Sequence, residues 1–128
     1  MTLTDNRRPI VLNFDDSAGE FEGALRLDLS TWQEMIRFGC KWNQFQALGN
    51  YLNQHLPAQF GCLLMGSGDY HHITQLLLAR QVITRPIHLI VCDNHPDNMR
   101  YPFGIHCGSW VYWASQLPHI ARIDVIGI

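Results

Sequence analysis

The sequence predicts an α/β fold with a mainly parallel sheet, and three observations support this prediction. From residue 60 onward, apolar segments of strand length alternate with segments whose apolar residues recur at helical spacing. The connections between them are short, as expected for strand–helix–strand units with right-handed crossovers. The strand segments are almost continuously apolar, which is typical of parallel strands covered on both faces.

The N-terminal part of the chain is predicted to contain two strands and two helices. Apolar runs and alternation indicate the strands. Ser30 and Gln33 have the spacing of a capping box and predict the first helix, which Gly39 ends. Apolar residues at helical spacing predict the second helix, which is amphipathic. The expected elements are strands at 10–14 and 25–29 and helices at 31–38 and 41–55.

The C-terminal part is predicted to be a regular succession of strands and helices. Pro86 precedes the most strongly apolar strand, and Pro118 ends the last helix. A polar loop at 93–107 separates that strand from that helix. The expected elements are strands at 60–65, 87–92 and 122–128 and helices at 73–81 and 109–117.

Composition limits the classes of protein to which the chain can belong. Its 128 residues are the size of one domain, 1–128, and 47% are apolar while only 16% are charged. Soluble proteins average about 25% charged residues, so an unusually large part of this chain should be buried and disorder is excluded. No basic cluster exceeds the pair Arg7 and Arg8, so we expect no nucleic-acid partner.

The distribution of apolar residues and cysteines indicates a cytoplasmic protein. The longest apolar runs are far shorter than the roughly 20 residues that cross a bilayer, so we expect no membrane association. The first eight residues hold no apolar signal core. The four cysteines include no C-x-x-C pair, and we expect buried free thiols.

The chain stops inside an apolar strand, at 123–128. Because chain ends are usually polar and lie at the surface, we expect this sequence to be the N-terminal portion of a longer domain. The last strand should then expose apolar surface and an unpaired edge. We therefore expect either a homo-oligomer or association with a missing C-terminal half.

Polar side chains follow two of the predicted parallel strands, at the sheet edge where ligands gather in α/β proteins. Asp93, His95 and Asp97 alternate after the strand at 87–92, and extended backbone places alternate side chains on one face. Pro96 favours extended backbone at His95. Carboxylate and imidazole together suit Mn²⁺, Fe²⁺ or Zn²⁺, and two carboxylates allow a two-metal centre.

A second polar segment, at 66–72, follows the strand at 60–65 and contains adjacent histidines. His71 and His72 diverge by about 100° in a helix, so only one of them should face a metal while the other packs. Asp69 is either a helix N-cap or a group that orients a histidine ligand. Asp15 and Asp16 follow the first strand and could reach the same edge.

Two further histidines need an interpretation. His106 lies in the loop after the D-x-H-x-D segment and is either a proton shuttle or a residue that fixes the turn into the next helix. His88 lies within an apolar strand, so we expect a hydrogen-bonded core histidine.

These segments resemble the ureohydrolases, the group of arginase, agmatinase and formimidoylglutamase. Residues 66–74, GSGDYHHIT, resemble the G-G-D-H-S segment of that group, and residues 93–97, DNHPD, resemble its D-x-H-x-D segment. His106 to Gly108 resembles its downstream H-G segment, and residues 124–128 resemble the strand that follows. The order is the same, and the resemblance covers residues 60–128.

The resemblance implies a three-layer α/β/α fold of the arginase–deacetylase type, incomplete in this chain, and a pair of Mn²⁺ ions. His71, Asp93 and Asp97 would bind one ion, with Asp93 bridging and His95 on the other ion. Asp97 and His106 would be the catalytic residues, with His106 as the proton shuttle. A metal-bridging hydroxide would attack the carbon of a guanidino substrate and hydrolyse a non-peptide C–N bond.

The sequence departs from the ureohydrolase pattern in three places. Tyr70 is inserted before the histidines, and alignment on Ile73 and Thr74 selects His71 as the ligand. Cys107 stands between His106 and Gly108. The second D-x-D segment of the family is absent, so the chain supplies at most four of six expected ligands and should be weakly active or inactive alone.

Two alternatives to a ureohydrolase remain open. Histone deacetylases share the fold and use adjacent histidines, so a deacetylase-like amidohydrolase with an amide substrate is one alternative. The other is a non-catalytic arginase-like domain whose retained motif serves structure or binding.

Overall fold

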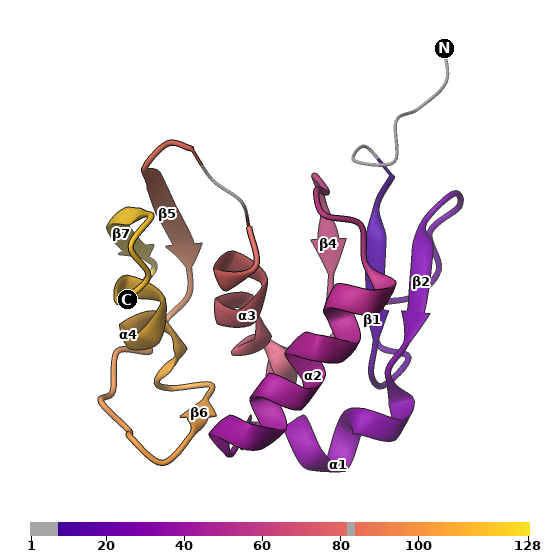
Figure 1. The fold of residues 1–128 in the computed structure, drawn as a ribbon, viewed down its shortest axis with the longest axis horizontal. Coiled ribbons are helices and arrows are strands. Elements are labelled where there is room, and N and C mark those ends of the chain that lie inside the picture. The colour runs from indigo at the N-terminus through magenta and orange to yellow at the C-terminus, as the bar shows by residue number, and fades with distance from the viewer. Residues whose placement is uncertain (1–7, 82–83) are drawn as a thin grey trace.

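The chain folds as a mixed α/β protein in which parallel strands and helices alternate (Figure 1). The computed structural model describes residues 8–81 and 84–128, so the expectation about the first residues, 1–7, lies outside the described residues. The strands are β1 Ile10–Asn13, β2 Leu25–Asp28, β3 Gly39–Cys40, β4 Leu63–Leu64, β5 Ile87–Cys92, β6 Ile105–His106 and β7 Ile120–Ile126. The α-helices are α1 Gln33–Ile36, α2 Trp42–His55, α3 Ile73–Ala79 and α4 Trp110–Ser115, and two 3₁₀ turns are η2 Ser30–Trp32 and η3 Gly68–Tyr70.

The strands of the described residues pair in three small sheets. β1 pairs in parallel with β2 on one side and β4 on the other. β5 pairs in parallel with β7, which confirms the expected parallel relation of these two strands. β3 and β6 form a short antiparallel pair.

The expectation that β4, β5 and β7 share one sheet is wrong for the described residues. β4 bonds to β1 instead, and Figure 1 shows α3 between β4 and β5 in the view. Apolar periodicity identifies a strand from its own residues, but the neighbour depends on which edge is available. β1 is buried on both faces, and the edge that does not pair with β2 pairs with β4.

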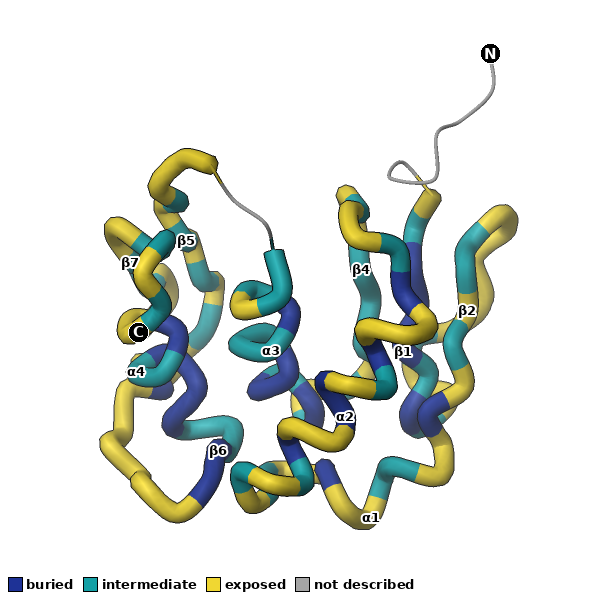
Figure 2. Tube along the Cα trace, in the orientation of Figure 1, coloured by how far each residue is buried: buried dark blue, intermediate teal, exposed yellow. Residues whose placement is uncertain are grey.

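A single hydrophobic core lies between the helices and the strands. Figure 2 shows buried residues along β1 and on α2 and α3. The predicted amphipathic helix is confirmed as α2, whose buried residues recur at helical spacing. Phe14 and Tyr70 stack with ring centroids 4.3 Å apart, so the end of β1 packs directly on η3. This contact holds the turn that leads to His71.

Only one face of β5 is covered by the described residues, contrary to the expected cover on both faces. Leu89 and Val91 pack against the core, whereas the alternate residues His88, Ile90 and Cys92 are exposed. His88 is therefore not a core histidine, and its Nε2 lies 2.6 Å from Asp124 Oδ2. All four cysteines are free, as expected, but Cys62 and Cys92 are exposed rather than buried.

The expected helix at 31–38 is replaced by η2 and the single turn of α1. The capping box does not form, because the Asp28 carboxylate already accepts a hydrogen bond from the Ser30 N–H at 2.9 Å. Phe38 then adopts a positive φ of 65° and donates its N–H to the Asp69 carbonyl. This bond connects α1 to η3.

β7 begins two residues earlier than expected and ends at Ile126, because Gly127 turns the chain with φ of 110°. Within the described residues, every helix is too short or too polar to cross a membrane.

Candidate metal centre

Three of the predicted ligands converge in space. His71, Asp93 and Asp97 each offer one ligand atom, and these atoms lie within 4.8 Å of one another. His71 lies between η3 and α3, and Asp93 directly follows β5. Asp97 lies in the loop between β5 and β6. We call these three residues the His–Asp–Asp cluster.

The hydrogen bonds of His71 direct one ring nitrogen toward the two carboxylates. Nδ1 lies 2.5 Å from the Gly68 carbonyl oxygen, which can only accept, so Nδ1 carries a hydrogen. Nε2 lies 3.0 Å from Asp97 Oδ2 and 3.8 Å from Asp93 Oδ2. A neutral His71 therefore presents a lone pair to two negative oxygens, an arrangement that requires a cation or a second proton between them.

The surroundings of His71 favour that positive charge. Its hydrogen bond with the Cys107 thiol raises the pKa of His71 to about 10, assisted by Gly68 and Asp97 and opposed by burial. Without a metal, His71 is accordingly an imidazolium at neutral pH. A metal ion at this position would replace the Nε2 proton.

The two carboxylates of the cluster differ in exposure and in proton affinity. Asp97 is only 7% exposed, and burial together with its hydrogen bond to Asp93 raises the pKa of Asp97. The same hydrogen bond lowers the pKa of Asp93, whose Oδ1 also accepts the His95 N–H at 3.1 Å. A proton shared between neighbouring carboxylates is a further group that a metal ion would displace.

His72 points away from the cluster, so the structure places His71 and not His72 beside the carboxylates. His72 is fully buried, its Nδ1 lies 3.4 Å from Cys107 Sγ, and its Nε2 is buried without a hydrogen-bond partner among the described residues. Burial lowers the pKa of His72 to about 4. His72 is therefore a neutral packing residue at physiological pH.

His95 and His106 are not brought into the cluster. His95 is 74% exposed, and its Nδ1 lies 4.0 Å from Asp93 Oδ1. His106 lies in β6, where its Nδ1 accepts the Gly108 N–H at 3.0 Å and its ring packs edge-on against Tyr101. In this arrangement His106 fixes the turn before α4.

The other predicted polar residues serve the loops around the cluster. Asp15 Oδ2 accepts a hydrogen bond from Ser67 Oγ at 2.9 Å, so Asp15 reaches the turn before η3 but not the cluster. Asp69 forms a 3.0 Å ion pair with Arg37 and neither caps a helix nor orients His71.

Three contributors to the site were missed by the sequence reasoning. These are the Gly68 carbonyl, the Cys107 thiol and the Trp110 indole, whose Nε1 donates to Asp97 Oδ2 at 3.0 Å. Trp110 was expected only as a residue of the helix at 109–117, without a role in the site. No sequence signal identifies a backbone carbonyl or a distant indole as a hydrogen-bond partner.

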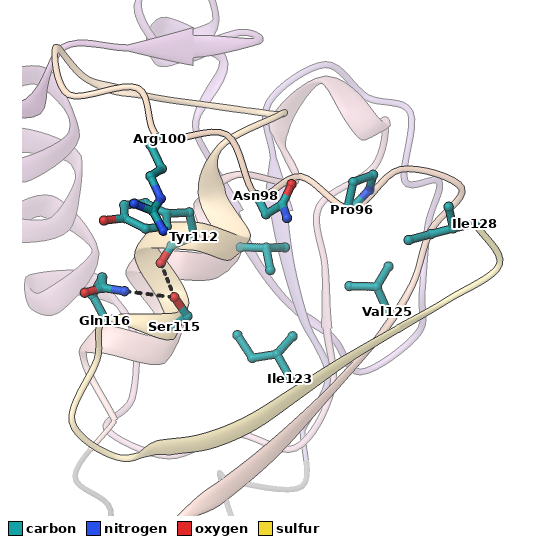
Figure 3. Close-up of a pocket in the computed structure, with 10 residues that line it drawn as sticks. Pro96, Asn98, Arg100, Tyr112, Ser115, Gln116, Ile123, Val125 and Ile128 are labelled. Atoms are coloured by element: carbon teal, nitrogen blue, oxygen red, sulfur yellow. Dashed lines mark hydrogen bonds between the residues drawn. The ribbon is translucent and has the colours of Figure 1, made fainter.

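Two cavities flank the loop that carries Asp97. One, of about 450 Å³, lies over the cluster and is bordered by all three of its residues, His95 and Cys107. The other, of about 530 Å³, lies between this loop, α4 and β7 (Figure 3). In Figure 3 the Arg100 side chain lies over the Tyr112 ring, with 5.3 Å from the guanidinium carbon to the ring centroid. Of these two cavities, Asp97 borders only the first.

Comparison with known proteins gives one similarity to report. A 72-residue segment, 56% of this chain, is 36% identical to an uncharacterized protein of Thermotoga maritima. The segment covers 29% of that protein's length, so the chain spans well under two thirds of this relative. No family model and no solved structure matches the chain. The chain is thus similar to part of a longer protein that is itself uncharacterized, and the chemistry of the cluster is the basis for a functional proposal.

Proposed function

We propose that this chain belongs to a metal-dependent hydrolase of non-peptide C–N bonds, of the ureohydrolase type. The observation that carries the proposal is the direction of His71 Nε2. This atom faces two carboxylate oxygens while Nδ1 is held by the Gly68 carbonyl. Metal-binding histidines are oriented in this way, with the second ring nitrogen donating to a carbonyl or carboxylate.

The donor set fits a divalent first-row ion such as Mn²⁺. One imidazole and two carboxylates suit Mn²⁺, Fe²⁺ or Zn²⁺, and carboxylates favour the harder Mn²⁺ among them. The cluster corresponds to the set that the ureohydrolase resemblance assigns to one ion. A second ion would require His95 to turn toward Asp93, and the His95 side chain is 74% exposed.

The residues around the cluster suit a small polar substrate. When bound, a divalent ion lowers the pKa of water and stabilises negative charge that develops on a substrate. Asp93 and Asp97 supply negative charge that holds a cation, and the 450 Å³ cavity above them admits a small molecule. A guanidino compound has the planar carbon and the amine leaving group that the ureohydrolase reaction needs.

We further propose a three-layer arginase-like fold for this domain. Parallel pairing of β5 with β7 and of β1 with β2 and β4 supports this architecture. The exposed alternate residues of β5 also support it, because a second helical layer would cover them.

Metal binding and a substrate panel test the proposed function. Isothermal titration with Mn²⁺ should show binding to the wild-type chain and at least a tenfold loss in His71→Ala. His55→Ala is the matched control, since His55 ends α2 and its Nδ1 lies 2.7 Å from the Tyr51 carbonyl oxygen of the same helix. Equal binding by both variants would refute the metal centre.

The substrate panel separates the ureohydrolase from the two alternatives. Release of urea or amine from guanidino compounds supports the proposal, and activity on acetylated amines supports the deacetylase-like reading. Metal binding without turnover of either class supports a non-catalytic arginase-like domain. That last reading is favoured by the fact that the described residues gather only three ligand atoms.

A further inference from the structure

Trp110 contacts two of the three residues of the His–Asp–Asp cluster. Its Nε1 donates to Asp97 Oδ2 at 3.0 Å, and its ring meets the His71 ring edge-on with centroids 6.1 Å apart. The indole is 3% exposed, so this hydrogen bond is shielded from water. The residue therefore lies in direct contact with the candidate ligands without being able to bind a metal itself.

The backbone of Asp97 is also held by the first turn of α4. Asp97 has a positive φ of 50°, an uncommon conformation for a residue with a side chain. Its carbonyl accepts the Val111 N–H at 3.0 Å, so successive residues of α4 bond to the backbone and the side chain of Asp97. The first turn of α4 thus fixes both the position and the rotation of this carboxylate.

A neutral donor is suited to this task. A lysine or arginine at this position would neutralise Asp97 and compete with a metal ion, whereas an indole N–H leaves the negative charge in place. The bond occupies one lone-pair direction of Asp97 Oδ2, and the same oxygen also lies 3.0 Å from His71 Nε2.

We propose that Trp110 is a positioning residue of the metal centre, which holds the Asp97 carboxylate in the orientation where it and His71 face a common ion. This inference rests on the proposed metal centre. It goes beyond that proposal because the ureohydrolase-like segments do not include Trp110. A purely structural role would make the indole N–H dispensable as long as the ring volume is kept.

The test removes the N–H and keeps the ring. Trp110→Phe loses the donor, and replacement of Trp110 by 3-benzothienylalanine keeps the bicyclic shape while sulfur replaces the N–H. Trp113→Phe is the matched control, because its Nε1 donates to the Tyr101 carbonyl, at 3.2 Å, away from the cluster. Mn²⁺ affinity is measured by the electron paramagnetic resonance signal of free Mn²⁺, and folding is checked by thermal unfolding.

We expect both Trp110 replacements to weaken Mn²⁺ binding about 10- to 100-fold, the range known for partners of metal ligands. Trp113→Phe should stay within about twofold of wild type. In an Asp97→Asn background the Trp110→Phe change should add little, since the indole acts through Asp97. The Co²⁺ absorption spectrum should change in Trp110→Phe and not in Trp113→Phe.

The outcomes separate the two proposals. If the wild-type chain binds Mn²⁺ and a folded benzothienylalanine protein binds it equally well, the positioning role of Trp110 is wrong while the metal centre stands. If the wild-type chain binds no Mn²⁺, the metal centre is refuted and the role of Trp110 with it.

Discussion

The pKa values of two adjacent histidines are shifted in opposite directions because their surroundings differ. His71 faces two carboxylates and a thiol, and its pKa rises to about 10, while burial lowers the pKa of His72 to about 4. The sequence predicted that only one of them could face the site, since neighbours diverge in a helix. It could not predict which pKa rises, because Asp97 comes from the loop after β5 and Cys107 from the residue that follows β6.

The metal-free chain should be most stable near pH 6.5. His72 is neutral when folded, so the unfolded chain binds more protons between about pH 4 and 6.5, and stability falls with acidification. The loss from this buried group amounts to roughly 3 kcal/mol by pH 4. Urea unfolding across pH measures it, and His72→Leu should flatten this acid limb.

At alkaline pH, the stability of the chain changes with pH in the opposite direction. The raised pKa of His71 gives stability that is fully present below about pH 6.5 and is lost as pH rises through about 10. His71→Gln should remove this dependence between about pH 6.5 and 9 in the same urea experiment, while burial, which raises the pKa of the Cys40 thiol to about 12, lowers stability above pH 9 in both proteins. A loss of stability with rising pH that is unchanged in His71→Gln would contradict the assignment.

Cys107 should influence the protonation of His71 directly. The hydrogen bond with its thiol is the main cause of the raised pKa, so Cys107→Ala should shift the titration of His71 downward in an NMR experiment on ring protons. Cys92→Ala is the control, because Cys92 is exposed on β5. An unchanged His71 titration would show that the carboxylates alone set the pKa.

Elements with strong periodicity were predicted well, and elements that depend on partners were not. β5 matches the expected strand at 87–92, and α2 matches the expected helix to within one residue. The pair β3–β6 was missed, because two residues on each side give no periodic signal. The helix at 31–38 failed because Asp28 took the N–H that the capping box needed.

The β3–β6 pair should depend on the absence of a side chain at Gly104. A Cβ there would overlap the Cys40 carbonyl oxygen, a backbone atom that cannot turn aside. We expect Gly104→Ala to cost about 1–3 kcal/mol of unfolding free energy, as other overpacked sites do. Gly68→Ala is the control, since an added Cβ there meets nothing within 4 Å, and equal costs in urea unfolding would refute the argument.

At the scale of the whole molecule, the order of the strands was the least predictable feature. The residues of β4 and β5 identify both as strands, yet β4 pairs with β1 and β5 pairs with β7. The same limit applies to the candidate site. His71, Asp93 and Asp97 were expected at one sheet edge and lie together, whereas His95, expected with them, is 74% exposed and lies outside the cluster.

β5 should allow the chain to pair with a second copy of itself. In the described residues β5 bonds to β7 on one side, and its other edge borders a cavity of about 440 Å³ lined by Leu89, Ile90 and Val91. Ile90 is 58% exposed, and no charged residue within 87–92 guards the strand against pairing. Natural edge strands usually carry a charge or a proline that prevents such pairing.

Sedimentation should therefore show a species heavier than 14.7 kDa, and Ile90→Lys should shift it toward the monomer. Met35→Lys, at an exposed position on α1, should leave it unchanged. An accessible strand edge without charged residues can form hydrogen bonds with the same edge of a second copy. A wild-type chain that sediments as a monomer at high concentration would therefore contradict this prediction.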